Sequence, residues 1–83
     1  MQFDDQLRRY FGTTDLESLS ADGLQSGVER MRVDLGLEQD RGRRFALWSL
    51  LFLLGDAPDL DETFEAAVDR DAARNFMELT EKG

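Results

Sequence analysis

The feature that most constrains the fold is a run of ten uncharged residues, Phe45 to Leu54, that is apolar at every position except Ser49. Its length and its leucine content favour a helix over a buried strand. Large apolar side chains point in every direction around such a helix, so other parts of the chain have to cover most of its surface. A membrane crossing needs about 20 apolar residues, so the run instead predicts the central helix of a small bundle, spanning about residues 40–54.

Amphipathic segments that can cover this helix lie on both sides of it. Apolar residues recur three or four positions apart in four further segments: 3–11, 21–35, 60–68 and 70–81. Side chains suited to capping a helix precede three of the predicted helices: Ser20, Asp40 and Asp59. The chain has 83 residues and no alternating strand pattern. We therefore predict one all-α domain, residues 1–83, folded as a compact bundle of four main helices plus one or two short ones.

Two details of the pattern predict particular contacts. Gly23 and Gly27 lie inside the predicted helix 21–35, where each costs about 1 kcal/mol relative to alanine. Their spacing of four places both on one helix face, which predicts a closely packed neighbour there. In the predicted helix 60–68, Phe64 and Val68 are expected to face the core.

Composition excludes much of catalytic and metal chemistry. The chain contains neither histidine nor cysteine, so Ser-His-Asp and Cys-His arrangements and most zinc, copper and haem sites are impossible. Neither an EF-hand loop nor a glycine-rich phosphate loop fits the sequence. We therefore predict that the protein is not an enzyme, and we expect no metal site and no cofactor.

The formal net charge is −8, and it is unevenly distributed. Residues 56–83 carry nine acids and three bases, a balance that repels nucleic acid and anionic lipid and favours basic partners. We expect no direct nucleic-acid binding and no membrane association. The first residues are acidic where a secretion signal is basic, so we expect a cytoplasmic protein. Nine of the ten bases are arginine, a bias typical of GC-rich genomes and expected of a bacterial source.

A cluster of three arginines, Arg41, Arg43 and Arg44, stands at the start of the predicted central helix. The helix dipole disfavours positive charge at this end, so something has to compensate the cluster. One interpretation is local ion pairing, with Glu38, Asp40 or the acidic C-terminal segment. The other is a site where the guanidinium groups hold an anion, such as a phosphate, or an acidic partner.

The apolar run also predicts a possible interface. Either the other helices enclose it completely, or part of it stays exposed, and an exposed apolar patch marks a binding surface. Tryptophan and phenylalanine often anchor such surfaces. The candidate interface residues are two aromatic residues of the run and three acids that follow it: Trp48, Phe52, Asp61, Glu62 and Glu65.

Three functions are compatible with these features. The leading hypothesis is a small acidic protein that acts as a non-catalytic protein–protein interaction or regulatory module and binds either another protein or a second copy of itself, as a homodimer. The first alternative is an acidic nucleic-acid mimic or antagonist, which requires the carboxylates to form one continuous exposed stripe. The second is a small anion- or ligand-binding domain that uses the Arg41–Arg44 turn, which requires a pocket beside the arginines.

Overall fold

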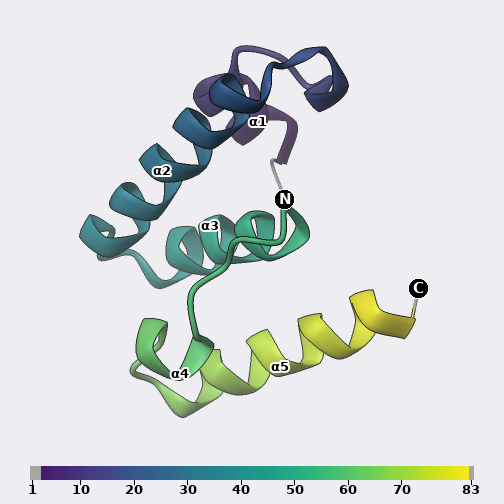
Figure 1. Cartoon of the computed structure of the whole chain (residues 1–83). Helices are drawn as coiled ribbons and strands as arrows, with labels where there is room; N and C mark the ends of the chain where they lie inside the picture. The colour runs from purple at the N-terminus through teal and green to yellow at the C-terminus, as the bar shows by residue number, and fades with distance from the viewer. Residues whose placement is uncertain (1–2, 83) are drawn as a thin grey trace.

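The helices stack in three layers, with the predicted central helix in the middle. The computed structural model describes residues 3–82, and no strand occurs among them. The elements are α1 (Phe3–Phe11), the 3₁₀ helix η1 (Leu16–Ser18), α2 (Ala21–Leu37), α3 (Arg41–Leu53), α4 (Leu60–Thr63) and α5 (Ala67–Lys82). Helix α3 contacts both α2 and α5 and lies between them (Figure 1). The prediction of an all-α bundle with four main helices and two short ones is confirmed.

Helix α3 supplies the largest part of the core. Asp40 caps it by accepting a hydrogen bond from the backbone N–H of Arg43 at 2.9 Å. The five consecutive residues 47–51 are all buried, as expected of a helix that is apolar all round. Coverage stops before the C-terminal end, where Leu53 is 51% exposed. Part of the apolar run therefore stays exposed, which is the second of the two arrangements that the sequence left open.

Helices α1 and α2 form one outer layer, and they touch through a glycine. A Cβ atom added to Gly27 would lie 2.1 Å from Cε1 of the Phe11 ring. The ring therefore lies directly on the α2 backbone, and the predicted close neighbour is confirmed at this position. At Gly23 the nearest atoms belong to Ser20 and Leu19, which immediately precede α2, so this glycine accommodates no second helix.

Helix α2 begins at the predicted place but ends later than predicted. Ser20 caps it by accepting a hydrogen bond from the backbone N–H of Gly23 at 3.0 Å. The helix continues to Leu37, two residues beyond the predicted end. Gly36 lies within this extension and keeps an ordinary helical backbone rather than the left-handed conformation of a terminal glycine.

The predicted helix over residues 60–68 is wrong, because the chain leaves the helical path between Thr63 and Ala67. Phe64 is extended, with φ −111° and ψ 121°, and its side chain is 2% exposed. The turn that carries Phe64 into the core places Val68, which was predicted to face the core, outward and 63% exposed.

Arginine side chains stabilise this break by satisfying the carbonyl groups that a continuous helix would have used. Arg44 donates to the carbonyl of Thr63 at 2.5 Å. Arg70 donates to the carbonyls of Phe64 at 3.0 Å and Glu65 at 2.7 Å. A buried carbonyl without a partner costs about 1–3 kcal/mol. These hydrogen bonds avoid that cost and so allow the helix to break here without a large loss of stability.

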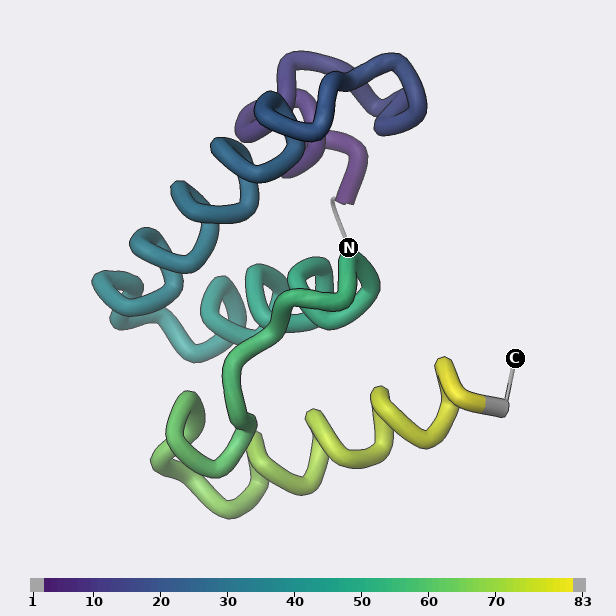
Figure 2. The backbone as a smooth tube through the Cα atoms, viewed as in Figure 1, coloured from purple at the N-terminus to yellow at the C-terminus, as the bar shows by residue number. Residues whose placement is uncertain are grey.

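The connection between α3 and α4 turns back on itself at Gly55, which has a φ of +85°. It then runs along α3 before it reaches α4 (Figure 2). The indole N–H of Trp48 donates to the carbonyl of Pro58 at 2.9 Å and holds the connection in place. Asp59 caps α4 by accepting from the backbone N–H of Asp61 at 2.8 Å. Across residues 3–82, no helix combines the length and the apolar content that a membrane crossing requires.

Candidate functional site

An aromatic cluster fills the space between α3 and α5. Trp48 is stacked on Phe52, with ring centroids 5.5 Å apart and an interplanar angle of 15°. Both rings meet Phe76 of α5 edge-on, at 6.4 Å for Trp48 and 6.0 Å for Phe52. Phe45 and Phe64 extend the cluster towards the start of α3. Stacked and edge-to-face pairs each add about 0.5–1.5 kcal/mol beyond area burial, so the floor of any site on this cluster is rigid.

An apolar hollow of about 370 Å³ opens beside the Trp48–Phe52 stack. We call it the aromatic groove. Its apolar lining comes from α3, the connection and the last two helices: Trp48, Phe52, Ala57, Pro58, Leu60 and Met77. Three charged residues complete the lining: Asp59, Asp61 and Arg74. Trp48 is buried, whereas Phe52, Leu60 and Met77 are each only partly buried, so their apolar atoms are accessible from the groove.

Residues 56–65, which we call the acidic segment, border the aromatic groove. This segment carries five carboxylates and no base, and all five acids are exposed: Asp56, Asp59, Asp61, Glu62 and Glu65. Among the residues whose side chains the structure describes, Arg74 is the only base that lines the groove. It pairs with Asp61 at 2.7 Å and with Asp71 at 3.5 Å. The positive charge at the groove is therefore already matched, and the surroundings are negative.

The arginine turn lies on a different side of α4, in a second hollow of about 640 Å³. Arg41 makes two hydrogen bonds to the carboxylate of Asp69 in α5, at 2.8 and 3.0 Å. Hydrogen bonding to Arg41 lowers the pKa of the Asp69 carboxyl. Glu62 and Glu65 line the same hollow, so acids outnumber the bases around it.

Arg44 projects into the fold and joins two helix ends. It donates to the carbonyls of Leu35 and Glu38 at the end of α2, both at 2.8 Å, as well as to Thr63 at the end of α4. Helix C-termini carry partial negative charge, so they compensate a partly buried guanidinium group without a carboxylate. Arg43 points elsewhere and lines a third hollow, of about 380 Å³, beside Tyr10.

A polar contact between Tyr10 and Asp34 ties α1 to α2. The Tyr10 hydroxyl donates to the Asp34 carboxylate at 2.5 Å, and Arg30 donates to the Tyr10 carbonyl. Burial, followed by the hydrogen bond to Asp34, raises the pKa of Tyr10 to about 12. A phenol with this pKa stays protonated near neutral pH, so it acts as a donor that holds the helices together and not as a base.

The structure brings together only part of the predicted set of site residues. Trp48, Phe52 and Asp61 meet at the aromatic groove, whereas Glu62 and Glu65 line the hollow beside Arg41 and Arg44. The sequence offered no signal for Met77 and Arg74 as groove residues, because both come from α5 and reach the groove through the turn at Phe64. No group of three or more potential metal ligands occurs within residues 3–82.

Compared with known proteins, the chain matches no protein-family model, and neither a curated protein nor a solved structure matches it significantly. The functional argument therefore depends on the residues and their geometry.

Proposed function

We propose that this protein is a non-catalytic interaction module that binds another protein through the aromatic groove and the adjoining acidic segment. One observation carries the proposal. A rigid aromatic floor with partly exposed apolar walls adjoins the acidic segment, which carries five exposed carboxylates and no base, and two of these acids, Asp59 and Asp61, line the groove.

The lining of the groove has the properties of a partner-binding surface. Aromatic side chains give large contact area at little entropic cost and often dominate binding energy. Phe52 is already fixed by its stack on Trp48, so its side chain loses little conformational entropy when a partner covers it. Met77 adds an unbranched, polarizable side chain that adapts to different partner shapes.

The arginine hollow supports an anion site less well than the groove supports a partner. The guanidinium group of Arg41 is hydrogen-bonded to Asp69, and that of Arg44 is hydrogen-bonded to three carbonyl groups. An anion in this hollow would have to displace these contacts and approach Glu62 and Glu65. Of the three arginines of the cluster, only Arg43 makes no side-chain hydrogen bond or ion pair among the described residues, and it lines the hollow beside Tyr10 instead. One exposed arginine is a weak anion site.

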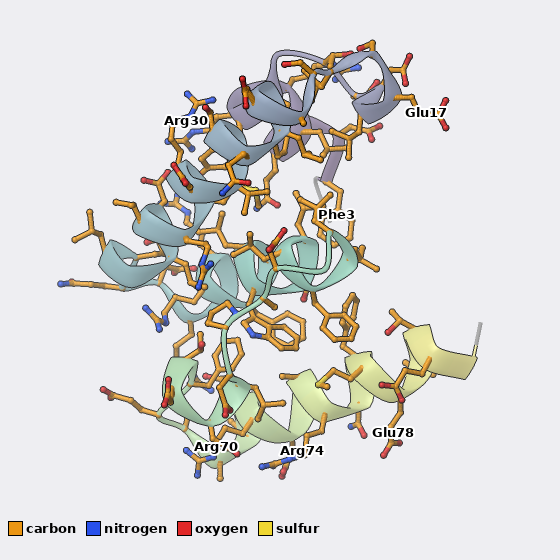
Figure 3. All side chains as sticks on the ribbon, viewed as in Figure 1. Phe3, Glu17, Arg30, Arg70, Arg74 and Glu78 are labelled. Atoms are coloured by element: carbon orange, nitrogen blue, oxygen red, sulfur yellow. The ribbon has the colours of Figure 1, made fainter. Side chains whose placement is uncertain are left out.

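The placement of the carboxylates also favours an interaction module over a nucleic-acid mimic. Glu17 lies at the α1–α2 end of the molecule and Glu78 lies on α5, on the other side of α3 (Figure 3). Arginines pair with acids along the surface, as Arg74 does with Asp61 and Arg41 with Asp69. A mimic needs one uninterrupted stripe of negative charge.

A second copy of the chain is a poorer occupant of the groove than a different protein. Twofold symmetric dimers place the same patch of both subunits against each other. Such a dimer through the groove would bring two acidic segments, with five carboxylates each, into close approach. Like charges facing each other across an interface cost several kcal/mol.

Affinity capture from the source organism, combined with sedimentation of the purified protein, tests the proposal. Ala57→Gln fills the groove from the connection, and Ala21→Gln makes the same change at an exposed position at the start of α2. We expect the wild type and Ala21→Gln to retain the same partner and Ala57→Gln to lose it. The proposal is contradicted if Ala57→Gln retains every partner, or if the wild type captures nothing and sediments as a monomer.

A further inference from the structure

We infer that the aromatic groove binds a basic amphipathic helix of the partner. One face of this helix carries apolar anchor residues, and lysine or arginine residues flank them. This inference rests on the proposed function and specifies the chemistry of the occupant. It follows from the charge around the groove and from the way the hydrogen-bonding groups of the groove are already used.

The charge of the occupant follows from the unpaired carboxylates. Asp56 and Glu62 are exposed, and their side chains make no ion pair or hydrogen bond within the described part of the chain. The groove itself is lined by two acids, Asp59 and Asp61, and by one base, Arg74, which is already paired with Asp61. The rest of the acidic segment adds carboxylates and no base. An occupant of the groove therefore sits in a negative field, and bases beside its apolar anchors are favoured.

The conformation of the occupant follows from the donors. An extended peptide binds by pairing its backbone with a sheet edge or with side chains such as a tryptophan indole N–H. Residues 3–82 contain no strand, and the Trp48 indole N–H is already donated to Pro58. A helical peptide needs neither a sheet edge nor a free indole N–H, because its backbone groups are hydrogen-bonded within the helix. It also presents apolar anchors three and four residues apart on one face.

A designed peptide of leucine and lysine, about 14 residues or four helical turns long, is a direct probe. Its leucines occupy one helix face, and it contains no tryptophan. Trp48 is the only tryptophan of the chain and lines the groove, so its emission reports occupancy. We expect saturable binding that changes this emission and that weakens as ionic strength rises from about 0.05 to about 0.5 M. A peptide of the same composition with scattered leucines, and one with glutamate in place of lysine, are expected not to saturate.

Variants of matched charge separate a specific site from general attraction to an acidic protein. The double variant Asp56→Asn/Glu62→Gln removes two exposed carboxylates from the acidic segment, and Asp4→Asn/Glu17→Gln removes two exposed carboxylates from α1 and η1. Exposed ion pairs contribute about 0.2–1 kcal/mol each, so we expect the first variant to weaken peptide binding about three- to tenfold and the second to change it less than about twofold.

Three results would overturn the inference: equal binding of the scattered peptide, equal binding of the glutamate peptide, or equal weakening by the two charge variants. Its failure is distinguishable from failure of the proposed function. If Ala57→Gln abolishes capture of a host partner while the leucine–lysine peptide does not bind the wild type, the groove is an interaction site and its occupant is not a basic helix.

Discussion

The contact between Phe11 and Gly27 gives the sharpest test of the packing, because the same helix contains a matched control. A Cβ atom at Gly27 would lie 2.1 Å from Cε1 and 2.3 Å from Cδ1 of the Phe11 ring. Carbon atoms prefer separations of about 3.5–4.0 Å, so in Gly27→Ala the ring must move by more than about 1 Å. Phe11 is only 9% exposed, and the ring has little free space in which to move.

The magnitude of the effect follows from two opposing contributions. Replacing a glycine within a helix by alanine gains about 1 kcal/mol in helix propensity. Overpacking a well-packed core costs about 1–3 kcal/mol. Because the overlap falls on a ring and not on the end of a flexible chain, we place the cost near the upper limit and expect Gly27→Ala to lower the free energy of unfolding by about 1–2 kcal/mol. In a domain of this size that corresponds to a melting temperature lower by about 4–16 °C.

Urea unfolding followed by circular dichroism measures this difference, and Gly36→Ala is the control. No atom lies within 4 Å of a Cβ at Gly36, which is also in α2, so this change is expected to stabilise the protein by up to about 1 kcal/mol. A smaller side chain at Phe11 relieves the overlap, so Phe11→Leu and Gly27→Ala together should destabilise less than the sum of the two single changes. The reasoning is refuted if both glycine variants shift stability in the same direction.

Three further predictions test other parts of the structure. Within residues 3–82 the buried Ser49 hydroxyl has no hydrogen-bond partner, so Ser49→Ala should raise the free energy of unfolding by about 1 kcal/mol in urea titrations; a loss of stability would contradict this. Arg44→Met leaves three carbonyls unpaired and should lower the free energy of unfolding by at least about 2 kcal/mol in the same assay. Arg41→Met removes only an exposed ion pair and should lower it by less than about 1 kcal/mol. Equal losses in the two variants would contradict the assigned roles. Tyr10 is the only tyrosine of the chain, so absorbance near 295 nm should show its ionisation at a pKa of about 12. The folded-state pKa lies above the unfolded value of about 10, so this stabilisation is complete below about pH 10 and is lost as the pH rises from there towards 12. Asp34→Asn should move the pKa of Tyr10 down, and a value that stays unchanged in this variant would rule out the assigned hydrogen bond.

Local sequence signals predicted the central helix and the starts of α2, α3 and α4 well, but the last helix begins at Ala67, three residues before its predicted start at residue 70. Ser20, Asp40 and Asp59 each cap the helix that follows them, because a cap depends on residues within three positions along the chain. The position of α3 in the middle of the stack follows from its apolar surface, which no other segment of the chain shares.

The break at Phe64 could not be predicted from local signals. Residues 60–68 have helical spacing, and what interrupts the helix is a set of hydrogen bonds from Arg44, in α3, and Arg70, in α5. Non-local partners override propensity in this way, and no spacing within the segment reveals them. The same break orients α5, so it also explains why the sequence indicated Trp48 and Phe52 as interface residues but not Met77.

The central claim is that a partner binds at the aromatic groove. Chemical-shift perturbation of the isotopically labelled protein, titrated with a captured partner, tests this claim most directly. We expect the largest shifts at Phe52, Ala57, Leu60 and Met77, with the Trp48 indole N–H among the affected signals. Shifts concentrated on the outer face of α2, where Val33 and Leu37 are 61% and 75% exposed, with the groove signals unmoved, would contradict it.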